Sequence, residues 1–106
     1  MSLDVHLSRN EEEVYWANIT HNLNTMADEA GIYKELWRPD EINITKAEQL
    51  IEPLKLGLER LKAEPKKYEQ FNSSNGWSLY KNFVPFVEEY LKACIENPDT
   101  DVYVSR

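Results

Sequence analysis

The chain has 106 residues, with 12 Lys and Arg against 19 Asp and Glu, so its formal net charge is −7 when both histidines are neutral. This length fits one domain spanning residues 1–106, and an apolar fraction of 42% excludes a disordered acidic tail. No run of about 18 apolar residues and no basic and then apolar N-terminus is present, and the excess of acids disfavours contact with phosphates. We therefore expect a cytoplasmic protein that binds neither membranes nor nucleic acid directly.

The first predicted helix leads up to a glycine. Its apolar side chains are three or four residues apart, which places them on one stripe of a helix. These side chains are Trp16, Ile19, Leu23, Met26 and Ala30. Gly31 then ends the helix as a left-handed C-cap, because glycine adopts a positive φ at little cost. A short helix or turn over residues 32–37 follows and ends before Pro39.

Two longer helices are predicted farther along the chain. One begins at Thr45, where Thr45 and Glu48 have capping-box spacing, and Pro53 inside it should introduce a kink. Gly57 in the same helix suggests that another backbone or an aromatic ring lies close to it. The last helix covers residues 80–95, after a turn at 72–76. The predicted core comprises Trp16, Ile19, Leu23, Met26, Leu50, Leu54, Leu58, Leu61, Phe83, Val87, Leu91 and Cys94.

The sequence thus predicts a mainly α fold, a small single-domain helical bundle of three main helices plus short helical turns. Both chain ends carry the alternating pattern of strands, at Val5 and Leu7 and again at Val102 and Val104. Strands this short need a partner, so a two-stranded ribbon formed by the chain ends is compatible with the predicted bundle.

An uncharged polar stretch gives the main functional hypothesis. Residues 14–27 contain no charged side chain, although 29% of the chain is charged. On a helix, Asn18, His21, Asn22 and Thr25 follow the i, i+3, i+4, i+7 spacing and form one face of hydrogen-bonding groups. Asn and Thr are mediocre helix formers, so this face costs propensity. We interpret it as a binding face or pocket wall; the alternatives are a buried polar network and a plain solvated face.

His21 is the side chain of this face suited to proton transfer near neutral pH. No serine or cysteine has a recognisable nucleophile setting, and Cys94 falls on an apolar stripe where an inert buried thiol is expected. His6 and His21 lie fifteen residues apart, and neither belongs to a metal-binding pair. The sequence therefore predicts no metal and no cofactor.

Two more residues are candidates for the edge of the binding face. Trp77 follows a turn at the predicted start of the last helix, where it serves either as a core anchor or as part of an anion site. Arg106 is the other candidate. The acidic run at residues 11–13 is most simply a solvated start near the positive end of the first helix.

Several motifs spread over nearly the whole chain give a resemblance. They are Asn18-Ile-Thr-His-Asn-Leu23, Met26-Ala27, Ala30-Gly31-Ile-Tyr33, Leu36-Trp37-Arg38-Pro39, Asn75-Gly76-Trp77, Tyr90-Leu-Lys-Ala-Cys94 and Val104-Ser-Arg106. On these motifs the chain resembles a family of small uncharacterised proteins from bacteria and their phages, although Ser78 stands where that family often has a second glycine. The resemblance implies an intracellular protein and carries no catalytic activity.

Three functions compete on the sequence alone. The leading one is a noncatalytic binding or interaction protein with a protein or small-molecule partner. It would use Asn18, His21, Asn22 and Thr25, with Trp77 and Arg106 at the edge. The second is a small hydrolase or transferase in which His21 is the general base. The third is an acidic inhibitor or nucleic-acid mimic that uses the acidic run at residues 11–13. The oligomeric state does not follow from the sequence.

Overall fold

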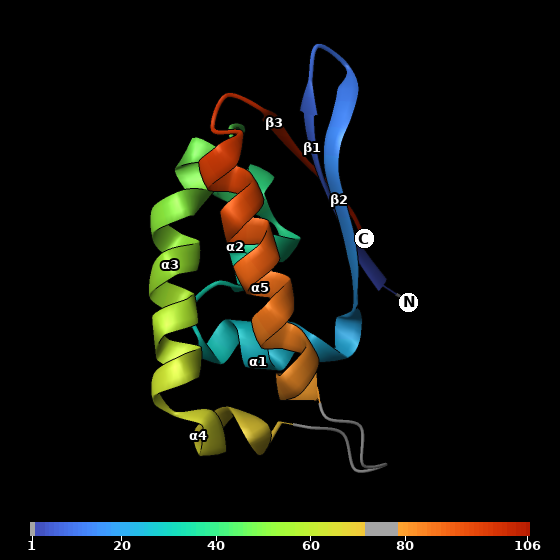
Figure 1. Cartoon of the computed structure of the whole chain (residues 1–106). Coiled ribbons are helices and arrows are strands. Elements are labelled where there is room, and N and C mark those ends of the chain that lie inside the picture. Colours follow the sequence, from blue (N-terminus) through green and yellow to red (C-terminus); the bar gives the residue numbers. More distant parts are fainter. Residues whose placement is uncertain (1, 72–78) are drawn as a thin grey trace.

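The computed structural model describes residues 2–71 and 79–106. A three-stranded sheet lies against a layer of helices (Figure 1). In chain order the elements are β1 (Ser2–Arg9), β2 (Glu12–Thr20), the 3-10 helix η1 (His21–Leu23), α1 (Asn24–Glu29), α2 (Tyr33–Trp37), the 3-10 helix η2 (Pro39–Ile42), α3 (Glu48–Ala63), α4 (Pro65–Glu69), α5 (Leu79–Glu96) and β3 (Asp101–Ser105).

The sheet is antiparallel and has the order β2-β1-β3, so β1 is central. β1 and β2 form a hairpin whose two turn residues, Asn10 and Glu11, have positive φ angles of 52° and 67°. Two such residues in succession match the twist of the flanking strands. The register between β1 and β2 shifts once, between Leu7 and Ser8. This shift marks a β-bulge in the hairpin.

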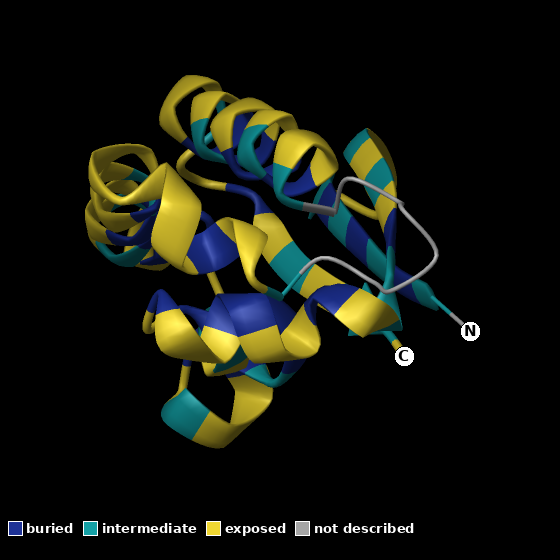
Figure 2. Ribbon diagram, turned by 90° about the horizontal axis from the view of Figure 1, so that it is seen from below, coloured by how far each residue is buried: buried dark blue, intermediate teal, exposed yellow. Residues whose placement is uncertain are grey.

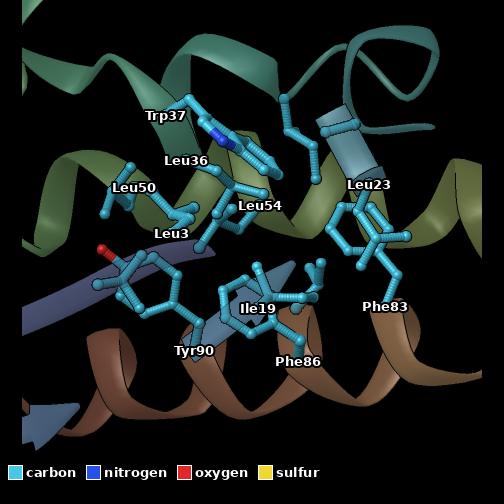
Figure 3. Packing of buried hydrophobic residues seen from close by; sticks show 14 of the residues in the cluster. Leu3, Ile19, Leu23, Leu36, Trp37, Leu50, Leu54, Phe83, Phe86 and Tyr90 are labelled. Carbon is cyan, nitrogen blue, oxygen red and sulfur yellow. The ribbon is translucent and has the colours of Figure 1, made fainter. Parts of the chain in front are cut away.

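The helices cover one face of this sheet. Leu3, Val5 and Leu7 of β1 are fully buried and alternate with partly exposed residues, as expected for a strand with one covered face. Figure 3 shows Leu3 and Ile19 from the sheet among side chains from the helices, including Leu54 and Tyr90. Buried residues gather where the elements face one another, and exposed residues lie on the outside (Figure 2).

The prediction of a mainly α helical bundle is wrong, because the protein has an α+β fold. The error comes from the first predicted helix, whose first half is β2 and whose second half contains only the short helices η1 and α1. The sequence Val14-Tyr15-Trp16 is rich in residues that favour strands. In β2 the residues that face the core are Tyr15, Ala17 and Ile19, which alternate with period two.

Several sequence predictions outside this segment are confirmed. The two longer predicted helices are α3 and α5, although α3 begins at Glu48 and not at the predicted Thr45. The chain ends do pair, as β1 with β3, although within a larger sheet than the predicted ribbon. Gly31 has a φ of +78° at the end of its helix. A close neighbour of Gly57 is also present, but it is neither backbone nor aromatic, because a Cβ there would lie 2.5 Å from Cγ2 of Ile32.

Other predictions need correction. The predicted core residue Trp16 is 54% exposed, and Leu58 and Leu91 are only partly buried. The predicted capping partner Glu48 is replaced by Gln49, whose Oε1 accepts from the N–H of Thr45 at 2.8 Å. The predicted turn at 72–76 lies outside the described residues. Among the residues described, no helix is long and apolar enough to cross a membrane.

Polar contacts fix β3 at its start. The guanidinium of Arg9, at the end of β1, donates from two nitrogens to the two carboxylate oxygens of Asp99, each at 2.6 Å. This hydrogen bonding lowers the pKa of Asp99 to about 2. The N–H of Val102 donates to the carbonyl of Thr45 at 2.9 Å, on the side of β3 that faces away from β1. The start of β3 is therefore held on both sides.

Two leucines of the predicted core differ in burial and should therefore differ in their contribution to stability. Leu54 on α3 is fully buried, whereas Leu91 on α5 is partly exposed. We expect Leu54→Ala to lower the free energy of unfolding by about 2 to 5 kcal/mol, because the truncation leaves a cavity. Leu91→Ala should cost less, since solvent already reaches that side chain. Chemical denaturation of both variants measures the difference, and equal losses would contradict the packing.

Candidate functional site

The sheet has a second face, which the described helices leave open (Figure 1). We define the open sheet face as the side chains that point away from the core on all three strands. Its principal members are Asp4, His6, Ser8, Glu13, Trp16, Asn18, Asp101, Tyr103 and Ser105. Their neighbours along each strand point into the core, so the alternation of the strands separates the two sets.

Three rings form a row across the centre of the open sheet face. Trp16 on β2 pairs with His6 on β1, and His6 pairs with Tyr103 on β3. The rings of His6 and Tyr103 lie 5.4 Å apart between centroids, at an interplanar angle of 47°. Trp16 is 54% exposed and Tyr103 is 62% exposed. Two large aromatic side chains are thus displayed to solvent on the two outer strands, with His6 between them.

Polar groups flank this aromatic row on both sides. On one side, Nδ2 of Asn18 donates to Oδ1 of Asp4 at 2.5 Å. On the other side, Nδ1 of His6 is hydrogen-bonded to Oε1 of Glu13, and Nζ of Lys46 donates to Asp101. Each carboxylate keeps acceptor positions beyond these contacts, because an ionised carboxylate has about four.

The open sheet face is acidic. Asp4, Glu13 and Asp101 belong to it, whereas no Lys or Arg among the described strand residues points outward from it. The one basic strand residue, Arg9, reaches Asp99 instead. Lys46 comes from the segment before α3 and compensates Asp101. The acidic character continues to the tip of the β1–β2 hairpin, which projects beyond the helices (Figure 1).

The four polar residues assigned to one helix face are not on one helix. Asn18 lies on β2 and belongs to the open sheet face, His21 and Asn22 lie in η1, and Thr25 lies in α1. Thr25 borders a shallow depression of about 300 Å³ that it shares with Asn24, Asp28 and Tyr33. The structure therefore brings Asn18 together with Trp16 and separates both from Thr25.

His21 is tied to the core by a tryptophan. Nε1 of Trp37, which is buried, donates to Nδ1 of His21 at 2.9 Å. Neutral His21 therefore carries its proton on Nε2, which is buried and has no hydrogen-bond partner among the described residues. Tyr33 stacks on Trp37 with a centroid distance of 5.6 Å. This arrangement holds η1 against the end of α2, which is a structural task.

The predicted edge residues lie elsewhere. Trp77 is outside the described residues. Arg106 follows β3, donates from Nη1 to the carbonyl of Trp37 at 2.8 Å, and lies 3.8 Å from a carboxylate oxygen of Asp40. It borders a groove of about 440 Å³ beside Pro39 and Val104. Its hydrogen bond anchors the end of β3 to α2.

Metal-binding and nucleophilic groups are sparse in the described part of the chain. No group of three His, Cys, Asp or Glu side chains there could hold a metal ion. Cys94 is buried in α5, and this burial raises the pKa of its thiol to about 12. A thiol with that pKa carries almost no thiolate at neutral pH, so it is a poor nucleophile.

Sequence reasoning missed the centre of the candidate site. The predicted helix puts Trp16 in the core, the sequence offers His6 only as a possible metal ligand, and it indicates no role for Tyr103. The signal for them is the alternation around each residue: Tyr15 and Ala17 flank Trp16, as Val102 and Val104 flank Tyr103. If both segments are strands, the residue between two inward-facing neighbours points outward to solvent.

No family model, curated protein or solved structure matches this chain. The resemblance to small bacterial and phage proteins therefore stays a prediction.

The role of His21 can be tested against its exposed neighbour Asn22. We expect His21→Ala to lower the free energy of unfolding by about 1 to 3 kcal/mol, because it leaves the buried N–H of Trp37 without an acceptor. Asn22→Ala should change stability by less than about 0.5 kcal/mol, since exposed substitutions are usually near neutral. Denaturant unfolding measures both, and a neutral His21→Ala variant would contradict the structural role.

Proposed function

We propose that this chain is a noncatalytic binding protein whose open sheet face docks another protein. The observation that carries the proposal is the row of Trp16, His6 and Tyr103, in which both outer rings are more than half exposed. Exposed Trp and Tyr side chains are enriched in protein interfaces, where they supply large contact areas and often dominate the binding energy.

The shape of the surface favours a macromolecular partner. Small-molecule sites are usually concave and enclose most of their ligand. The open sheet face presents its rings side by side on neighbouring strands about 4.8 Å apart, which suits a broad contact. The polar pairs on both sides of the row resemble the polar rim of an interface around an apolar centre.

The two alternative functions have weaker support. In a hydrolase or transferase, Nδ1 of the candidate base His21 would have to accept a proton from the substrate. That nitrogen already accepts the hydrogen bond from Trp37, which would have to break first. For a nucleic-acid mimic, the acidic run would have to form one ridge. Glu12 and Glu13 are consecutive strand residues, so their side chains point to opposite faces.

We propose that the protein acts in the cytoplasm. Reduced thiols persist there, and a single buried cysteine such as Cys94 fits that environment. The protein would act there by engaging its partner and not by chemistry.

Selection from a random peptide library tests the proposal. Peptides that bind the native chain are collected, and their affinities are then measured for Trp16→Ala and Tyr103→Ala. We expect each variant to lose about tenfold or more in affinity, as truncation of an aromatic hot spot does. Ile95→Ala is the matched control, because Ile95 is an equally exposed apolar residue on α5.

Comparison of the two aromatic variants with Ile95→Ala shows whether the selected peptides bind at the open sheet face. Peptides that bind both aromatic variants as tightly as the native chain would contradict the proposal. A thermal melt of each variant confirms that lost affinity does not reflect unfolding.

A further inference from the structure

We infer that the partner presents arginine side chains to the open sheet face, where guanidinium groups stack on Trp16 and Tyr103 and pair with the carboxylates of Asp4 and Glu13. This inference rests on the proposed function, because it names the chemistry of the partner at the same site.

The first step is the charge of the face. It carries three carboxylates, and within the described part of the chain Lys46, which pairs with Asp101, is the only Lys or Arg in an ion pair with one of them. Asp4 accepts from the neutral amide of Asn18, and among the described residues no Lys, Arg or His forms an ion pair with it. Glu13 keeps a half-exposed side chain beside His6. A cationic partner would find complementary charge at both positions.

The second step is the pair of exposed rings. A cation over the face of an aromatic ring is attracted by the ring quadrupole, and Trp is the best acceptor of this interaction. Trp16 and Tyr103 both offer exposed ring surface. Arginine fits better than lysine, because its planar guanidinium stacks on rings and donates two parallel bonds to one carboxylate.

The third step is the spacing of rings and carboxylates. Asp4 lies two residues before His6 on β1, and Asn18, its contact, lies two residues after Trp16 on β2. Residues two apart on one strand are separated by about 7 Å on the same face. Glu13 lies on the other side of the row. A guanidinium on the Trp16 ring would therefore have a carboxylate one position away in either direction.

The same features disfavour two other occupants. The phosphates of a nucleic acid would meet the carboxylates of Asp4 and Glu13 and no outward Lys or Arg on the described strands. A second copy of this chain would bring Asp4 and Glu13 against the same carboxylates. An arginine-bearing protein segment satisfies both the rings and the charges.

Three short labelled peptides of equal length test the inference by fluorescence anisotropy. They alternate Ser with Arg, with Lys, or with citrulline, which is the neutral isostere of Arg. We expect the Arg peptide to bind about tenfold or more tightly than the citrulline peptide, and more tightly than the Lys peptide. Trp16→Ala, Asp4→Asn and Glu13→Gln should each weaken Arg-peptide binding several-fold.

Matched controls separate the site from general acidity. Glu52→Gln removes one exposed charge from α3, at the opposite side of the molecule from the sheet (Figure 1), and should leave binding of the Arg peptide unchanged. Ile95→Ala should also have no effect. Trp16→Phe keeps an aromatic ring and should retain most of the binding, which guards against a folding defect in Trp16→Ala.

The possible results have distinct meanings. If the Arg and citrulline peptides bind with equal affinity and Trp16→Ala weakens both, the inference is overturned and the proposed function stands. If Glu52→Gln weakens binding of the Arg peptide as much as Asp4→Asn does, the binding is general electrostatic attraction to an acidic protein, and the inference is overturned. If no Arg peptide binds while library-selected peptides need Trp16, the inference alone fails; if neither binds through Trp16, both fail.

Discussion

The pairing of β1 with strands on both sides is the constraint on which the rest of the structure depends. β1 supplies Leu3, Val5 and Leu7 to the core, and all three are fully buried. The same pairing fixes the register that sets His6 between Trp16 and Tyr103. Because the side-chain period of a strand is two, a slip by one residue would exchange the buried face for the open one. Core and candidate site therefore share one register.

Contacts at the ends of the strands protect that register. Arg9 and Asp99 tie the hairpin to the turn before β3, and Arg106 ties the end of β3 to the backbone of Trp37. Trp37 in turn donates to His21, directly after β2. Two residues that the sequence offers as candidate site residues, His21 and Arg106, thus hold the framework, whereas the aromatic row is exposed on the open sheet face.

How far the sequence could be interpreted depends on the range of the contacts involved. The helices α3 and α5 could be predicted because their sequences carry long periodic patterns. The positive φ of Gly31 could be predicted because it is a local property of glycine at a helix end. β2 could not, because Trp16, Ile19 and Leu23 also fit a helical stripe, and only pairing with β1 decides between the two. Of the open sheet face, the sequence singles out Asn18 and, within the acidic run, Glu13, whereas Trp16 and Tyr103 come to lie on either side of His6 only through the pairing of three strands.

Proton NOE spectroscopy of the native chain tests this arrangement most directly. If residues 12–20 are β2, the spectrum should contain cross-strand contacts from His6 to Trp16 and from His6 to Tyr103, with strong sequential Hα–HN contacts along the segment. Contacts between residues i and i+3 along the same segment, such as Trp16 to Ile19, are the signature of a helix. Their presence without cross-strand contacts to His6 would contradict the sheet and the site built on it.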